Sequence, residues 1–145
     1  MKELELRRHA RRDPDDDALS SEGRAQAEHV GTTLPTDYVA VFVSPAKRAA
    51  ETVAWFLRGS RQLLPDHAIV SALADGDADQ AAVVAGLFDR VPNGGRGLVV
   101  GHTPLLERAV EGLTGTAIQP LAECEGVRLF RDDAGTWRAE ERRLP

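Results

Sequence analysis

The chain has 145 residues, of which 42% are hydrophobic and 28% are charged, and these proportions predict one globular domain over residues 1–145. A net charge of −5 argues against a nucleic-acid partner, which would require a basic face. The apolar runs are too short to span a bilayer, and the first residues lack the apolar segment of a secretory signal. The single cysteine, Cys124, fits a reducing compartment. We therefore expect a cytoplasmic protein without a membrane partner.

Apolar periodicity and turn residues divide the chain into alternating strands and helices. In chain order, these patterns predict a strand at residues 4–9, a helix at 21–34, a strand at 38–43, a helix at 45–59, a short strand at 69–70, a helix at 78–91, a strand at 97–101, a helix at 104–115, and a hairpin of strands at 127–130 and 137–144. Such alternation predicts an α/β fold with three α/β/α layers, a mostly parallel central sheet and a C-terminal antiparallel hairpin.

The starts of the predicted helices carry capping signals. Ser44 and Thr103 each stand before a proline, which predicts an N-cap followed by proline at the first helical position. Asp77, with a glutamine three residues later, predicts a capping box for the helix at 78–91.

Particular side chains follow three of the predicted strands. Arg8 and His9 end the first strand, Arg48 lies in the first turn of the helix after the second, and His102 follows the strand at 97–101. Ligands of open parallel sheets bind at the carboxyl ends of the strands, so we expect these four residues to converge. Arginine forks bind phosphate oxygens, and a neutral imidazole can attack phosphorus. No Cys/His cluster has metal-ligand spacing and no nucleotide-binding P-loop occurs, so we predict no metal and no cofactor.

Four sequence blocks resemble those of the histidine phosphatase superfamily, which includes the phosphoglycerate mutases. Residues 6–10 (LRRHA) resemble its Arg-His-Gly motif, and residues 19–27 (LSSEGRAQA) resemble its Leu-Thr-x-x-Gly-x-x-Gln-Ala helix. Residues 44–52 (SPAKRAAET) match its Ser-Pro-x-x-Arg-Ala-x-x-Thr block, and residues 101–104 (GHTP) match its second-histidine block.

The blocks occur in family order, and the resemblance implies a phosphoglycerate mutase-like fold. It also implies that His9 is the phosphorylated nucleophile, that Arg8 and Arg48 bind phosphate, and that His102 completes the phosphate pocket as a second catalytic residue.

The chain departs from the family pattern at two points. Ala10 replaces the usual glycine, which we expect to be tolerated. The chain is also too short for the inserted segment that carries a glutamate proton donor in larger members, and so it resembles the short phosphohistidine phosphatases. The remaining candidate donors are Asp13, Asp75 and Asp77, of which Asp13 is better explained as a solvated loop charge and Asp77 as a helix cap.

These features predict a metal-independent phosphatase that hydrolyses a phosphomonoester or a protein phosphohistidine through a phosphorylated His9. Its partner would be a phosphorylated small molecule or a phosphohistidine protein. Two alternatives stay open: a phosphoglycerate mutase-like phosphotransferase, and a non-catalytic phosphate- or phosphoprotein-binding module. We expect the loops at residues 11–18 and 60–77 to shape the entrance to the site.

Overall fold

The computed structural model describes residues 2–65 and 67–145. Its elements in chain order are β1 (Glu3–Arg8), α1 (Ser21–Gly31), β2 (Tyr38–Val43), α2 (Lys47–Ser60), β3 (His67–Ile69), the 3-10 helix η1 (Ser71–Ala74), α3 (Gln80–Arg90), β4 (Arg96–Gly101), α4 (Leu105–Thr114), β5 (Gly126–Arg131) and β6 (Trp137–Arg142). Among these residues, no helix is both long enough and apolar enough to cross a membrane.

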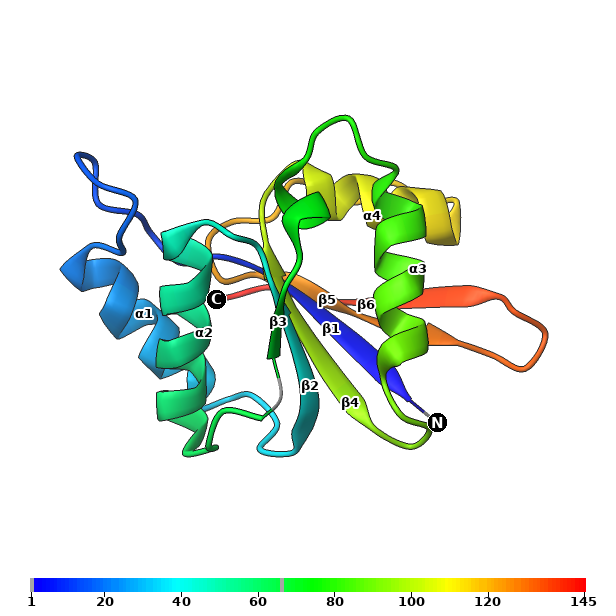
Figure 1. Ribbon diagram of the computed structural model, residues 1–145, viewed down its shortest axis with the longest axis horizontal. Coiled ribbons are helices and arrows are strands. Elements are labelled where there is room, and N and C mark those ends of the chain that lie inside the picture. Colours follow the sequence, from blue (N-terminus) through cyan, green and yellow to red (C-terminus); the bar gives the residue numbers. More distant parts are fainter. Residues whose placement is uncertain (1, 66) are drawn as a thin grey trace.

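Six strands form one sheet in the order β3-β2-β4-β1-β5-β6. The four strands from β3 to β1 are parallel, whereas β5 is antiparallel to β1 and β6 is antiparallel to β5. Helices α1 and α2 cover one face of the sheet, and α3 and α4 cover the other (Figure 1). This arrangement confirms the predicted three-layer α/β fold with its C-terminal hairpin.

A hydrophobic cluster lies on each side of the sheet, because the central strands are buried on both faces. Phe56 and Ala49 of α2 belong to the cluster beneath α1 and α2, together with Leu98 of β4. Phe88 of α3 and Val99 of β4 belong to the cluster beneath α3 and α4. Adjacent β4 residues therefore face opposite layers, as the alternation of side chains along a strand requires.

The strand register brings three carboxyl ends to one edge of the sheet. Arg8, the last residue of β1, pairs with Gly101, the last residue of β4. Val43, the last residue of β2, pairs with Val100 on the other side of β4. The residues that follow β1, β2 and β4 are therefore neighbours in space, although they are far apart in the sequence.

Three helix starts differ from the sequence-based predictions. Helix α2 begins at Lys47 with Ala46 at its N-cap, and α4 begins at Leu105 with Pro104 at its N-cap, so neither Ser44 nor Thr103 fills the predicted position. The predicted capping role of Asp77 is also wrong. Asp79 caps α3 instead, by accepting a hydrogen bond from the Ala82 backbone N–H at 3.2 Å.

Arg7 connects β1 to the chain segment before β5 through hydrogen bonds. It is buried and forms a salt bridge of 2.7 Å with Glu5, and its guanidinium donates to the Cys124 carbonyl at 2.8 Å. The Cys124 backbone N–H in turn donates to the Arg8 carbonyl at 3.1 Å. These bonds fix the segment around Cys124 against the end of β1, where the candidate site begins.

Candidate active site

His9 follows β1 directly, and its imidazole has one defined tautomer. Its backbone N–H donates to the Gly101 carbonyl at 3.1 Å, which fixes the residue at the ends of β1 and β4. Its Nδ1 lies 2.7 Å from the Ala10 carbonyl oxygen, and because a carbonyl only accepts, Nδ1 carries the proton. The lone pair of His9 is therefore on Nε2.

The environment of His9 keeps this imidazole neutral. Burial lowers the pKa of His9, and the positive charges of Arg48 and Arg8 lower it further, although the hydrogen bond to Ala10 acts in the opposite direction. A neutral imidazole with an unprotonated Nε2 is the form that can act as a nucleophile near pH 7.

Arg48 lies in the first turn of α2 and directs one edge of its guanidinium toward both histidines. Its Nε is 3.3 Å from Nε2 of His9, and its Nη2 is 3.4 Å from Nδ1 of His102. The Nε–Nη2 edge of a guanidinium can donate two parallel hydrogen bonds to two oxygens of one phosphate. The third nitrogen, Nη1, donates to the carboxylate of Asp17.

His102 follows β4 and is buried beside Arg48. Its Nε2 is 2.5 Å from Oγ of Ser44, the residue after β2, and its ring centroid is 5.4 Å from that of His9. Because Nη2 of Arg48 can only donate, Nδ1 of His102 accepts and Nε2 carries the proton toward Ser44. Burial, followed by the charge of Arg48, lowers the pKa of His102 to about 4.

Arg8 contributes a positive charge that no described carboxylate compensates. Its Nη1 donates to the Leu121 carbonyl at 2.9 Å, and none of the salt bridges within residues 2–65 and 67–145 includes it. Its Nε is buried and has no hydrogen-bond partner among the described atoms. A half-buried guanidinium with an unpaired donor is a natural partner for an anionic ligand.

A cavity of about 610 Å³ opens in front of His9. Its lining residues are Arg8, His9, Arg11, Arg12, Pro14, Ser20, Glu22, Arg48 and Glu123. Arg11 forms a salt bridge of 3.0 Å with Glu22 and approaches Glu123 to 3.8 Å, so part of the wall carries both charges. The cavity thus has basic groups beside His9 and a mixed-charge wall formed by Arg11, Glu22 and Glu123.

Part of the predicted entrance lies at this cavity. Three residues of the first loop contribute to its wall, as expected for that loop: Arg11, Arg12 and Pro14. None of residues 60–65 and 67–77 lines it, so the described part of the second loop does not shape this entrance; Asp66 lies outside the described residues. Within the described chain, no group of three His, Cys, Asp or Glu side chains could hold a metal ion.

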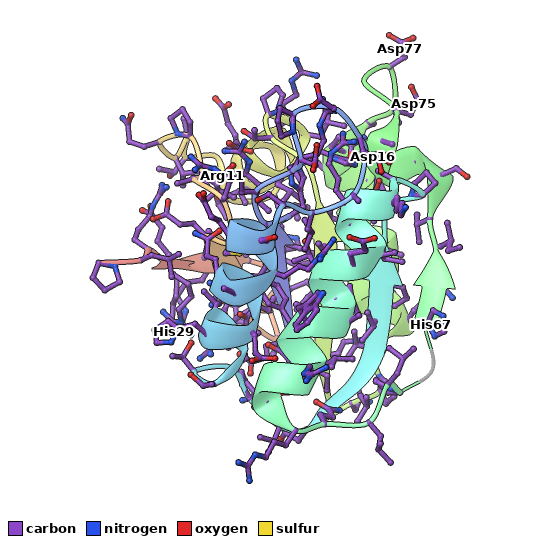
Figure 2. The ribbon with its side chains drawn as sticks, turned by 90° about the vertical axis from the view of Figure 1, so that its left-hand side faces the viewer. Arg11, Asp16, His29, His67, Asp75 and Asp77 are labelled. Carbon is purple, nitrogen blue, oxygen red and sulfur yellow. The ribbon has the colours of Figure 1, made fainter. Side chains whose placement is uncertain are left out.

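The three candidate proton donors do not line the cavity. The Asp13 carboxylate accepts from the Asp15 backbone N–H at 2.8 Å and so stabilises the turn of its own loop. Asp75 does the same for the Asp77 backbone N–H at 2.9 Å. Figure 2 shows Asp75 and Asp77 on a projecting loop with their carboxylates turned outward, and His29 and His67 lie toward the opposite end of this view from those two aspartates.

Two contacts in the site were missed from the sequence. Thr52 of α2 accepts from the Ala10 backbone N–H at 2.9 Å and donates to the Arg48 carbonyl at 2.7 Å, so it joins the His9 segment to α2. Its place in the matched block at residues 44–52 was a usable signal. Asp17 had no such signal, because it is one of three consecutive aspartates.

The Ala10 methyl group is fully buried in the cluster beneath α1 and α2.

Two histidines, two arginines and a cavity lie together at the carboxyl end of the parallel strands of an α/β fold. The model of the histidine phosphatase superfamily (branch 1) matches residues 3–76, and the chain belongs to this family. That match includes His9 and Arg48 but ends before His102. None of the curated proteins gives a significant match to the chain.

Solved structures share the fold over nearly the whole chain. The protein histidine phosphatase SixA complexed with tungstate is 22% identical, with a TM-score of 0.74 and coverage of 97% of this chain and 96% of that one. Phosphoserine phosphatase from Entamoeba histolytica is 14% identical, with a TM-score of 0.79 and coverage of 99% and 98%. Phosphoglycerate mutase from Plasmodium falciparum is 20% identical, with a TM-score of 0.72 and coverage of 99% and 94%.

Proposed function

We propose that this protein is a metal-independent phosphatase that hydrolyses a protein phosphohistidine or a phosphomonoester through a phosphorylated His9. The observation that carries the proposal is the placement of Arg48, whose two-donor edge faces the lone pairs of two neutral histidines. Phosphoryl transfer depends mainly on positioning and charge stabilisation, and this arrangement supplies both around one point.

In the proposed reaction, Arg8 and Arg48 bind the non-bridging oxygens of the phosphoryl group. Nε2 of His9 attacks phosphorus, and the bond from phosphorus to the leaving group breaks with its electron pair going to the leaving group. Water then attacks the phosphorus of phospho-His9, the P–N bond breaks, and inorganic phosphate is released with His9 regenerated. The negative charge of the bound phosphoryl group raises the proton affinity of His102, which allows its Nδ1 to gain a proton and donate to a phosphate oxygen.

The carboxylates near the cavity favour phosphohistidine as the substrate. Asp13, Asp75 and Asp77 do not line the cavity, whereas Glu22 and Glu123 line it but pair with Arg11. An ion-paired carboxylate is a poor proton donor. An alcohol leaving group needs a proton, while a phosphohistidine leaves as an imidazole whose conjugate acid has an ordinary pKa of about 6.5, and so needs less help.

We also propose that residues 1–145 form one domain and that the protein is cytoplasmic. One sheet includes strands from Glu3 to Arg142, and both hydrophobic clusters pack on it, which supports a single folding unit. Cys124 is a buried free thiol, which is compatible with a reducing compartment.

The test is a substrate panel of a phosphohistidine peptide, a sugar phosphate, 3-phosphoglycerate and an aryl phosphate. We expect the highest kcat/KM for the phosphohistidine peptide, and we expect His9→Ala to lower turnover by about 10³-fold or more, as is usual for loss of a nucleophile. His29→Ala is the matched control, because His29 is exposed and distant from the cavity lining, and it should retain wild-type turnover.

Three results would contradict the proposal. Full activity of His9→Ala would exclude the phosphorylated His9. Transfer of phosphate to a second hydroxyl of 3-phosphoglycerate rather than to water would indicate a mutase. Saturable binding of the panel without turnover would indicate a non-catalytic binding module.

A further inference from the structure

Asp17 contacts the site from a loop that no sequence motif marks. Its Oδ1 accepts from Nη1 of Arg48, and its Oδ2 accepts from the Lys47 backbone N–H at 2.8 Å. The carboxylate therefore binds both the first free N–H of α2 and the side chain of the residue that follows. A negative charge at a helix N-terminus is electrostatically favourable, so the contact stabilises the position of Asp17 as well as that of Arg48.

The contact with Asp17 does not involve the two-donor edge of Arg48. Nε and Nη2 face His9 and His102, whereas Asp17 contacts Nη1. The guanidinium is planar, so fixing Nη1 also fixes the direction of the opposite edge. Asp17 therefore contacts Arg48 outside the edge that would hold two phosphate oxygens.

The loop that carries Asp17 is ordered by its own hydrogen bonds. The Asp13 backbone N–H donates to the Ala18 carbonyl at 2.7 Å, and Arg12 pairs with Leu19 in an antiparallel bridge. The Leu19 backbone N–H also donates to Oε1 of Glu51 at 2.9 Å. The loop is thus attached to α2 through Asp17 and again about one turn further along through Glu51. These two attachments hold the Asp17 carboxylate in a fixed position relative to α2.

The geometry points to Asp17 as a positioning residue, which holds Arg48 with its two-donor edge directed at the phosphoryl group. This inference rests on the proposed phosphatase function. Asp17 itself touches neither histidine through any described hydrogen bond. Partial burial acts to raise the pKa of Asp17, but the hydrogen bonds from Arg48 and Lys47 outweigh it and lower that pKa, so the residue is ionised at neutral pH.

A competing explanation makes the opposite prediction. If Asp17 were an internal anion that competes with phosphate for Arg48, removing its charge would strengthen phosphate binding and raise kcat/KM at low substrate concentration. If Asp17 positions Arg48, removing the charge frees the guanidinium to rotate, and both phosphate binding and kcat/KM fall. The sign of the change therefore separates the two roles.

The decisive variants are Asp17→Asn and Asp17→Glu, with Asp15→Asn as the control. Asparagine keeps an oxygen that can accept from the Lys47 N–H but loses the ion pair with Arg48, so α2 retains its cap. Asp15 is exposed in the same loop, and its loss gives the same change in net charge. Misplacement of a phosphate-binding group by about 1 Å can cost about 100-fold in rate.

We expect Asp17→Asn to lower kcat/KM by about 10- to 100-fold, with a fall in kcat as well as a rise in KM, because Arg48 is needed in the transition state. Calorimetric binding of inorganic phosphate should weaken in Asp17→Asn, recover partly in Asp17→Glu and stay at the wild-type value in Asp15→Asn. Tighter phosphate binding by Asp17→Asn, or the same values as Asp15→Asn, would overturn the inference.

The two proposals can fail separately. If the wild-type protein turns over no phosphorylated substrate, the proposed function fails, and the phosphate-binding measurements still decide whether Asp17 positions Arg48. If the wild-type protein is active and Asp17→Asn matches it in both assays, only the role of Asp17 is wrong. Thermal unfolding of each variant shows whether a loss follows from unfolding, and Asp17→Glu retains the charge if Asp17→Asn does not fold.

Discussion

The chemistry of the site depends on imidazoles that stay neutral beside guanidinium groups. His9 directs its Nδ1 proton to the Ala10 carbonyl, and His102 directs its Nε2 proton to Ser44, so both lone pairs face Arg48. Burial lowers the pKa of each histidine, and Arg48 adds to that effect. The positive charge of the site therefore lies on its arginines, while His9, the proposed nucleophile, is unprotonated.

A nuclear magnetic resonance titration of the imidazoles tests this description. We expect His9 to titrate below its ordinary value of 6.5 and His102 near pH 4, and we expect Arg48→Ala to raise the pKa of both. Arg58→Ala, which removes an exposed arginine of α2, should leave both unchanged. A His9 pKa above 6.5 in the wild-type protein would contradict the proposed neutral nucleophile.

The lowered pKa of His102 also determines how the free energy of unfolding changes with pH. The unfolded chain binds protons at its histidines as the pH falls through about 6.5, while folded His102 binds one only near pH 4. The contribution of His102 to the free energy of unfolding is therefore present above pH 6.5 and is lost as the pH falls from there toward 4.

The sequence marked the central residues of the site but not their supporting contacts. Arg8, His9, Arg48 and His102 stand at strand ends in recognisable blocks, and the structure brings them together. Asp17 could not be chosen among neighbouring aspartates, because only the three-dimensional path of the loop decides which carboxylate reaches α2. Asp79 rather than Asp77 caps α3, because the chain turns once more before the helix begins.

The packing of α1 against α2 helps to position the site, because Arg48, Glu51 and Thr52 all lie on α2. The two helices cross where glycines allow their backbones to touch. A Cβ atom at Gly59 would lie 2.0 Å from the Glu28 carbonyl oxygen, which is far inside contact distance. Close packing at this crossing holds α2, and so Arg48, against the rest of the site.

Substitution at this crossing should be destabilising where an ordinary helical glycine is not. We expect Gly59→Ala to lower the free energy of unfolding by about 1–3 kcal/mol, since the helices must separate. Gly86→Ala on α3 meets nothing within 4 Å and should raise it by about 0.5–1 kcal/mol, because alanine favours helix. Urea denaturation measures both, and a neutral or stabilising Gly59→Ala would show that the helices are not in close contact there.

The order and type of the strands and α-helices followed from the sequence, while several boundaries and the 3-10 helix η1 did not. Buried runs such as residues 38–43 and 97–101 are unambiguous strands, and the helices between them have clear apolar faces. The helix after β2 starts at Lys47, later than predicted, and the Ser44 hydroxyl contacts His102 and the Ala46 backbone N–H rather than an N–H group of the first turn of α2. A contact between residues so far apart in the chain leaves no signal in the local sequence.

At the scale of the whole molecule, the parallel pairing of β1, β4 and β2 creates the site. The register places the ends of these strands side by side, so residues from the first and last thirds of the chain meet around Arg48. The loop at residues 11–18 and the segment near Glu123 then complete the cavity wall. No single segment contains the site. A covalent modification of one of its residues would therefore indicate that the complete site has formed.

Mapping of a trapped phosphoenzyme tests the central claim most directly. The protein is mixed with phosphoramidate or a phosphohistidine peptide, quenched under basic conditions and digested for mass spectrometry. We predict one acid-labile phosphoryl group, located on His9, formed and lost at a rate compatible with turnover, and absent from His9→Ala. A phosphoryl group on any other residue, or none in a wild-type enzyme that turns over the same substrate, would contradict the account.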